Sequence, residues 1–150
     1  MKMNKKIVFV LTVLLICIIS ITSVSALYYP DSFYNAISWT WTYDAPYTDD
    51  YNCLGYATGW MIWEWPWGGV QPTATQVDNY MLSFHFMVVN NSSPLIISYA
   101  KDGLVTHFSK VTGFNTCTAK WGEFERFRHA SWNPYYPTSV YGTLNAKYGY

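Results

Sequence analysis

Charged residues and enzyme-class motifs are both scarce in this chain. Only 12% of its 150 residues are Asp, Glu, Lys or Arg, and the formal net charge at pH 7 is zero. The sequence contains no C-x-x-C, H-x-H or H-E-x-x-H spacing, no phosphate-binding glycine loop and no G-x-S-x-G motif. A metal site would have to rest on three isolated residues, Cys53, His107 and His129. We therefore expect no metal site and no cofactor.

The first 26 residues have the pattern of a secretory signal peptide. Three lysines precede an apolar run over residues 7–21, and a small-residue sequence ending at Ala26 follows it. The run is about 15 residues long, whereas a helix that spans a bilayer needs about 20. We expect cleavage after Ala26, one domain over residues 27–150, a secreted or cell-surface location and no stable membrane span. A retained membrane anchor is the alternative.

Residues 27–150 carry more acidic than basic side chains. They retain six of the nine Lys and Arg and all nine Asp and Glu, so they lack the basic surface typical of nucleic-acid-binding domains. All eight Trp also fall in this part, and a domain of this size cannot bury every one of them. Exposed aromatic rings can stack on sugars or peptides, although aromatic residues are also ordinary core material.

Two helices are expected in the first half of the domain. Asn52 is a favourable N-cap for a helix over residues 53–63, which the sequence WEWPWGGVQP ends. A second helix is expected over residues 75–86, where apolar residues recur at i, i+3, i+4 and i+7. Thr75 and Asp78 resemble its capping box.

The second half is expected to form an antiparallel sheet. Short segments with strand composition alternate with tight turns, which predicts a meander. Residues 27–50 are expected to be extended or looped. Helices followed by strands make an α+β domain. The expected strands are residues 95–100, 105–112, 117–121 and 125–130.

Cys53 is the first candidate for chemistry. It follows Asn52 and so would occupy the first turn of the helix, where free N–H groups and the helix dipole stabilise a thiolate. The backbone N–H of Cys53 and the side-chain amide of Asn52 can serve as oxyanion donors. Only Cys53 and Cys117 remain after residues 1–26 are removed, so a disulfide or a small buried core thiol are the alternatives.

A thiol nucleophile needs a base, and His107 is the best-placed histidine. A hairpin folded about residues 113–115 would place His107 opposite residues 119–123, which include Lys120 and Glu123. Glu123 can accept a hydrogen bond from the imidazole and orient it, whereas Lys120 cannot. His129, on the following strand, could reach the same ring or the substrate. Lys120 and Glu123 are, taken alone, also typical of solvated strand edges.

The order of these motifs resembles that of papain-like cysteine domains. The segments are YNCLGYA, VTHFSK, TAKWGEFERFRHA and SVYG, and they are most similar to an uncharacterised small secreted branch of the NlpC-type peptidase and amidase superfamily. The resemblance implies N-terminal helices, with the catalytic cysteine at a helix start, packed on an antiparallel sheet of about four to five strands. It also implies Cys53 as nucleophile, His107 as base and a third polar residue among Glu123, Lys120 and His129.

Attack on a peptide amide through a thioester is the chemistry that this resemblance implies. The expected substrate of a secreted member is a cell-wall or surface peptide or polymer. Trp63, Trp65 and Trp67 follow the first helix and are expected to wall the substrate cleft, or else to form a hydrophobic lid. The competing hypothesis is a non-catalytic secreted module that binds glycan or protein through exposed Trp and Tyr and carries a Cys53–Cys117 disulfide.

Overall fold

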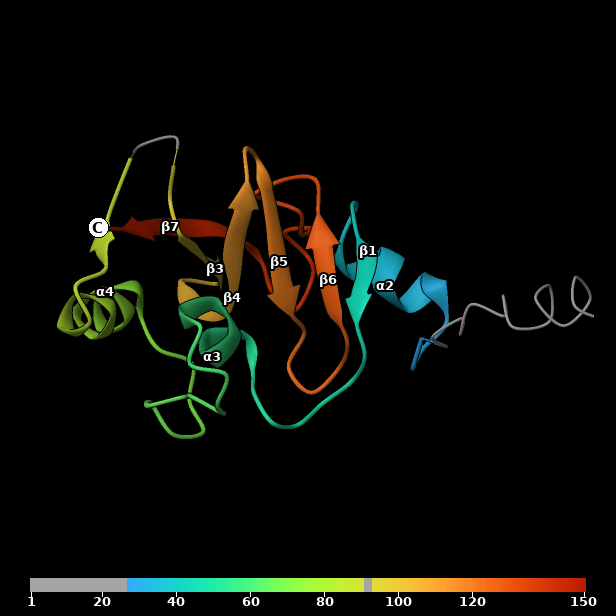
Figure 1. Ribbon diagram of the computed structural model, residues 1–150, viewed down its shortest axis with the longest axis horizontal. Helices are drawn as coiled ribbons and strands as arrows, with labels where there is room; N and C mark the ends of the chain where they lie inside the picture. The colour runs from blue at the N-terminus through green and yellow to red at the C-terminus, as the bar shows by residue number, and fades with distance from the viewer. Residues whose placement is uncertain (1–26, 91–92) are drawn as a thin grey trace, which may run out of the picture.

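The structure is a computed structural model that describes residues 27–90 and 93–150. In this part of the chain seven strands form one sheet in the order β1-β6-β5-β4-β3-β7-β2, with every neighbouring pair antiparallel (Figure 1). The predicted signal peptide, residues 1–26, lies outside the described residues. The strands are β1 (Thr42–Ala45), β2 (Met87–Val88), β3 (Ile96–Lys101), β4 (Leu104–Gly113), β5 (Thr116–Lys120), β6 (Arg126–His129) and β7 (Thr143–Gly149).

The four strands expected in the second half are present as β3 to β6, consecutive in the sequence and adjacent in the sheet. The turn between β3 and β4 illustrates the local cause. Asp102 and Gly103 have φ angles of 53° and 83° and connect the paired residues Lys101 and Leu104. A two-residue loop with positive φ at both positions matches the twist of the flanking strands, and Asp-Gly adopts this conformation readily.

Three short helices accompany the sheet in the described residues: α2 (Asp31–Ile37), α3 (Cys53–Thr58) and α4 (Ala74–Ser83). The helix expected over residues 53–63 ends at Thr58, because Gly59 takes a left-handed φ of 84°. The second helix begins slightly earlier than expected, with its capping box formed by Thr73 and Gln76. No helix in these residues is long and apolar enough to cross a bilayer.

The predicted fold class is wrong. A papain-like α+β arrangement would have N-terminal helices packed on four to five strands, whereas the described residues form a seven-stranded sheet with few short helices. The additional strands come from segments without a clear strand pattern. β1 lies in residues 27–50, which were expected to be extended or looped but also form the helix α2, and β7 lies in the aromatic tail. Both depend on long-range partners, β6 for one and β3 for the other, rather than on local signals.

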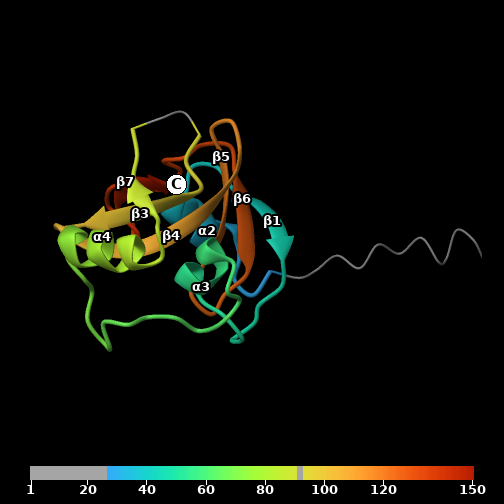
Figure 2. The same cartoon turned by 60° about the vertical axis from the view of Figure 1, so that its left-hand side comes forward.

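Two hydrophobic clusters lie on opposite faces of the sheet, because successive strand residues point to opposite sides. Ile96 belongs to one cluster and Ile97 to the other. Figure 2 shows α3 and α4 together in front of the strands. The α3-side cluster contains Cys53, Leu54, Ala57, Val77, Met81, Phe86, Ile96, Val105, Phe108 and Tyr148. The α2-side cluster contains Tyr34, Ile97, Tyr99, Ala119, Trp121, Phe127 and Tyr135.

Strands β4 and β5 pair over only part of their length. Their register runs from Lys110, opposite Thr118, outward to Gly113, opposite Thr116. The part of β4 that contains His107 and Phe108 pairs with β3 but not with β5. Helix α3 packs against both β4 and β5. The first turn of α3 therefore lies where these two strands separate, and this separation positions the candidate site.

Gly55, in α3, is predicted to be intolerant of a side chain. A Cβ atom added to it would lie 1.8 Å from the carbonyl oxygen of Ile62, and the Gly55 carbonyl also accepts a hydrogen bond from Met61 at 3.0 Å. Gly55→Ala should lower the free energy of unfolding by about 1–3 kcal/mol, despite the better helix propensity of alanine. Urea unfolding measures the change. Gly69→Ala, which has no heavy atom within 4 Å of the added Cβ, is the control. Equal unfolding midpoints for the two variants would contradict the close contact.

Candidate functional site

Cys53 occupies the first turn of α3, as the sequence predicts. Asn52 is the N-cap, and its Oδ1 accepts a hydrogen bond from the backbone N–H of Gly55 at 3.0 Å. The Asn52 side-chain amide, a predicted oxyanion donor, donates to the carbonyl of Glu64 at 2.7 Å. Through these two hydrogen bonds, the Asn52 side chain connects the loop after α3 to the start of the helix.

Burial dominates the chemistry of the Cys53 thiol. Its residue is 6% exposed, and burial raises the pKa of the thiol to about 11. Part of this increase is offset by hydrogen bonds from backbone N–H groups and by the positive charge of Lys120. The N–H groups are those of Phe108, Leu54 and Cys53 itself. A helix of six residues adds little to this effect because its dipole is small. The thiol is therefore protonated at neutral pH.

Lys120 is the cationic group that acts on Cys53. Its side chain is fully buried on β5, and its ammonium donates to the carbonyl of Gly122 at 2.7 Å and to that of Phe124. Burial lowers the pKa of Lys120 to about 8, while the charges of Cys53 and Glu125 act in the opposite direction. Lys120 is thus a buried cation whose charge acts on the thiol. The alternative expectation, a solvated charge at a strand edge, is wrong for Lys120.

His107 lies on β4 in a pocket of aromatic side chains. Its Nε2 is 3.1 Å from the hydroxyl of Tyr135, and its ring stacks on Tyr141 with centroids 3.8 Å apart. Burial holds the pKa of His107 well below its ordinary value, and the nearby His129 contributes in the same direction. His107 is therefore neutral at pH 7, the state in which an imidazole can accept a proton.

His107 and Cys53 share neighbours, although no hydrogen bond joins them in the described residues. The N–H that acts on the Cys53 sulfur belongs to Phe108, the next residue after His107. Burial raises the pKa of Tyr141, which stacks on His107, and a charge on Cys53 would raise it further. Phe108 thus connects the two predicted residues along β4: its N–H acts on Cys53, while the ring of His107 packs against Tyr135 and Tyr141.

A β-bulge beside His107 helps to build this cluster. Tyr99 pairs with His107 and Ala100 with Val105, which leaves Thr106 without a place in the register. The Thr106 hydroxyl donates to the carbonyl of Tyr141 at 2.7 Å. Bulges often redirect side chains next to functional sites. Here the bulged residue holds the Tyr141 segment over the imidazole.

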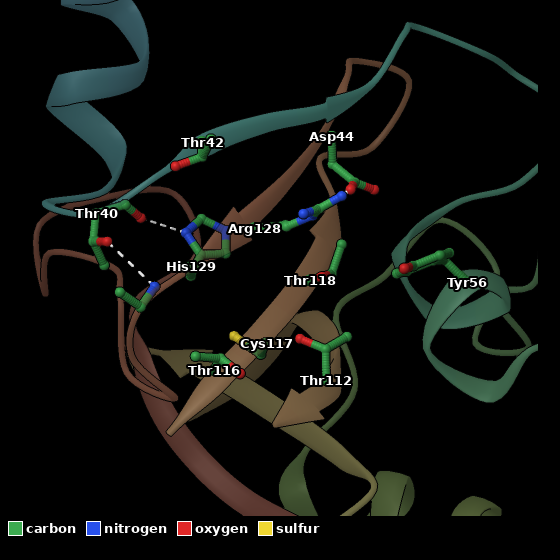
Figure 3. A pocket seen from close by; sticks show the side chains of 11 residues that line it. Thr40, Thr42, Asp44, Tyr56, Thr112, Thr116, Cys117, Thr118, Arg128 and His129 are labelled. Carbon is green, nitrogen blue, oxygen red and sulfur yellow. Dashed lines mark hydrogen bonds and ion pairs between the residues drawn. The ribbon is translucent and has the colours of Figure 1, made fainter. Parts of the chain in front are cut away.

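His129 is connected to His107 through Tyr135. The His129 Nδ1 contacts the carbonyl oxygen of Thr40 (Figure 3), and its Nε2 lies 3.3 Å from the Tyr135 hydroxyl. Burial lowers the pKa of His129 to about 4, so its ring is neutral at pH 7. A carbonyl oxygen can only accept, so His129 carries its proton on Nδ1 and accepts at Nε2.

This chain of contacts assigns the tautomer of His107. Since His129 accepts at Nε2, the Tyr135 hydroxyl donates its single proton there. The Tyr135 oxygen then accepts from the indole N–H of Trp121 at 3.2 Å and from Nε2–H of His107 at 3.1 Å. The Nδ1 of His107 consequently holds the lone pair. Sequence reasoning missed Tyr135, whose only signal was aromatic density in the tail, whereas Tyr141 belongs to the segment SVYG that the family resemblance includes.

Glu123 and the tryptophans occupy different positions around this cluster. Glu123 is exposed in the turn between β5 and β6, where its charge acts on Lys120 and Tyr47, while Tyr135 is the partner of His107. Trp65 and Trp67 are partly buried against the α3-side cluster, with the Trp65 ring 6.1 Å from that of Phe108. Trp63 is 50% exposed.

The two cysteines of the described residues are both free. Cys117 is buried on β5, where its sulfur donates to the carbonyl of Ser131 at 3.2 Å and contacts the Tyr99 hydroxyl at 3.5 Å. Cys53 lies in the α3-side cluster. The disulfide of the competing hypothesis is therefore not formed. Among residues 27–90 and 93–150, no group of three His, Cys, Asp or Glu is placed to hold a metal ion.

A family model described as Domain of unknown function (DUF7689) matches residues 42–149. This is more than half of the chain, which therefore belongs to that family. The matched part extends from β1 to β7 and contains Cys53, His107 and Tyr135. No curated protein and no solved structure matches the chain.

The Cys53 thiol is predicted to alkylate slowly at neutral pH, since its pKa is about 11. Lys120→Met removes the positive charge that lowers this pKa, so it should slow iodoacetamide labelling of Cys53. The pKa of Lys120 is about 8, so the difference from wild type should be largest below pH 8 and should disappear above it, where the amine is neutral. Mass spectrometry of the labelled peptide over pH 6–10 provides the rates. Lys101→Gln is the control, and a difference that persists at pH 10 would contradict an electrostatic role.

Proposed function

We propose that this member of the family is a thiol hydrolase that cleaves peptide amide bonds, with Cys53 as the nucleophile and His107 as the general base. The observation that carries the proposal is the hydrogen-bond chain through Tyr135. It leaves a neutral His107 with its lone pair on Nδ1, and the next residue along β4, Phe108, contacts the buried Cys53 thiol through its N–H. A base held in one tautomer by its other nitrogen is what a nucleophilic pair requires.

The reaction begins from an uncharged thiol and an uncharged imidazole. As the Cys53 sulfur attacks the amide carbonyl, its proton passes to Nδ1 of His107. The tetrahedral intermediate then loses the amine, which takes that proton, and a thioester remains. Water attacks the thioester while His107 accepts its proton, and cleavage of the carbon–sulfur bond returns the proton to the thiol. Concerted proton transfer suits a thiol whose pKa is about 11.

Lys120 supports this reaction as a fixed positive charge. Its field lowers the pKa of Cys53 and would stabilise the negative charge that develops on the substrate oxygen. The backbone N–H of Cys53 is the second donor for that oxygen. His129 acts through Tyr135, so its role is to position the base. Trp63, exposed beside the partly buried Trp65, contributes to a wall for the peptide.

Secretion and a cell-wall or surface peptide as substrate form part of the same proposal. Both rest on the signal-peptide pattern of residues 1–26, which precedes a domain with few charges and many aromatic residues. Protein recovered from the medium of a secreting culture should begin at Leu27, as intact mass will establish.

Amide hydrolysis is tested with that secreted protein and a mixture of cell-wall peptides, by mass spectrometry of newly formed amines and carboxylates. Cys53→Ala should abolish turnover, and His107→Gln should lower it by about 10²–10⁴-fold. Cys117→Ser is the matched control, since it alters another buried thiol outside the proposed site. Turnover by Cys53→Ala equal to that of wild type would exclude the proposed nucleophile.

The tautomer assignment has its own test. Long-range ¹H–¹⁵N spectra at pH 7 should place the proton of His107 on Nε2 and that of His129 on Nδ1. Tyr135→Phe removes the hydroxyl between the rings, so His107 should lose its fixed tautomer and its pKa should change. Tyr136→Phe, at the adjacent exposed residue, should leave both rings as in wild type. A proton on Nδ1 of His107 in the wild-type protein would contradict the proposed base.

A further inference from the structure

A polar groove lies on the α3 side of the sheet, across β1, β6, β5 and β4. Its volume is about 670 Å³, within the range of about 300–1,000 Å³ that small-molecule sites occupy. Figure 3 shows threonine, aspartate and arginine side chains from neighbouring strands around it. Threonine hydroxyls come from Thr40, Thr42, Thr112 and Thr116, while that of the buried Thr118 bonds to Tyr56.

The register of the sheet explains why these side chains meet. Thr42 pairs with Arg128, and Arg128 pairs with Thr118, so the three form one row across β1, β6 and β5. Thr116 is two residues from Thr118 and therefore points to the same face. Tyr56, from α3, closes one end of the row. The groove is thus built by strand pairing and does not include Cys53.

Positive charge is concentrated on this face. The domain over residues 27–150 has only six Lys and Arg. Lys110 pairs with Thr118, and Arg126 pairs with Lys120, so these cations share the face with Arg128 because the residues of a pair lie on the same side of the sheet. In a domain with more acidic than basic residues, four of six cations therefore lie on one side of β4 to β6; of these, Arg128 lines the groove and Lys120 is buried.

The guanidinium of Arg128 has N–H groups that can bind a ligand. Its side chain is 69% exposed, and its Nε bonds to Oδ1 of Asp44 at 2.5 Å. Asp44 also binds Arg126, so one carboxylate serves two guanidinium groups. The Nη groups of Arg128 have no hydrogen-bond partner among the described residues. Asp44 therefore fixes the orientation of the guanidinium while leaving its outer N–H groups for a ligand.

We propose that this groove binds a carbohydrate that carries a carboxylate. The outer N–H groups of Arg128 match the two oxygens of a carboxylate, which a planar guanidinium binds in bidentate fashion. Threonine hydroxyls both donate and accept, as sugar hydroxyls require. The local charge of two arginines and one aspartate favours a single negative charge. The site is independent of the proposed thiol chemistry, because no side chain that lines it takes part in that reaction except His129, which acts only through Tyr135.

The test uses three probes that separate the two kinds of recognition. Glucuronate combines sugar and carboxylate, glucose lacks the carboxylate, and acetate lacks the sugar. In ¹H–¹⁵N spectra of the purified protein, glucuronate should shift the amides of residues 112–118 and 128–130. Its dissociation constant should be at least tenfold lower than that of glucose or acetate. Raising the salt concentration should weaken glucuronate binding and leave glucose unaffected.

Variants assign the contacts. Arg128→Gln should weaken glucuronate binding at least tenfold, to the level of glucose, and Arg128→Lys should give an intermediate loss because it keeps the charge without the planar fork. Thr42→Val, which removes an exposed hydroxyl of the groove, should weaken both sugars and leave acetate unchanged. Cys53→Ala and Lys147→Gln, which are outside the groove, should bind as wild type does.

Three results would overturn the proposal. These are the absence of shifts with glucuronate, equal affinity for acetate and glucuronate, and unchanged glucuronate affinity in both Arg128 variants. Equal affinity for acetate would assign the groove to any carboxylate, including that of a peptide. The dispersion of each variant's amide spectrum verifies that it is folded. If Arg128→Gln does not fold, Arg128→Lys and Thr42→Val still decide the outcome.

Discussion

The hydroxyl group of Tyr135 is the interaction on which the interior of this domain depends. It meets His107 from β4, His129 from β6 and the indole of Trp121 at the end of β5. A buried imidazole or indole without a partner would cost free energy, because its polar atoms lose their water. One hydroxyl with one proton satisfies all three rings only when each takes a fixed donor or acceptor role. The orientation of both histidines follows from this condition.

The separation of β4 from β5 is the second feature that shapes this interior. If the two strands paired along their whole length, the start of α3 would have no place between them, and Phe108 would face a neighbouring strand rather than the Cys53 sulfur. Buried Lys120 lies at the same opening. The sheet therefore supplies the rigid support, and the irregular part of its hydrogen bonding leaves the opening in which the Cys53 thiol meets the Phe108 N–H and the field of Lys120. Such irregularity concentrates at functional sites in many proteins.

Features with a local cause could be predicted from the sequence, and those with a distant cause could not. The Asn52 cap, the position of Cys53 and the strands of the meander follow from side-chain capping and turn chemistry. The partner of His107 could not be found in this way, since Tyr135 comes from a segment without regular structure. Helix-start activation of Cys53 was expected, but burial outweighs it. The strands β1 and β7 were not predicted, because pairing with distant strands, and not amino-acid composition, makes these segments strands.

The outer strands of the sheet also determine how the molecule behaves toward its own copies. An exposed strand edge offers unpaired N–H and C=O groups that can recruit another chain, and long flat edges promote fibrils. In the described residues the outer strands are β1, with four residues and an irregular register near Ala45, and β2, with two. Neither offers a template long enough for another chain to extend. A domain whose aromatic residues are partly exposed is thereby protected against self-assembly by backbone geometry, with little help from surface charge.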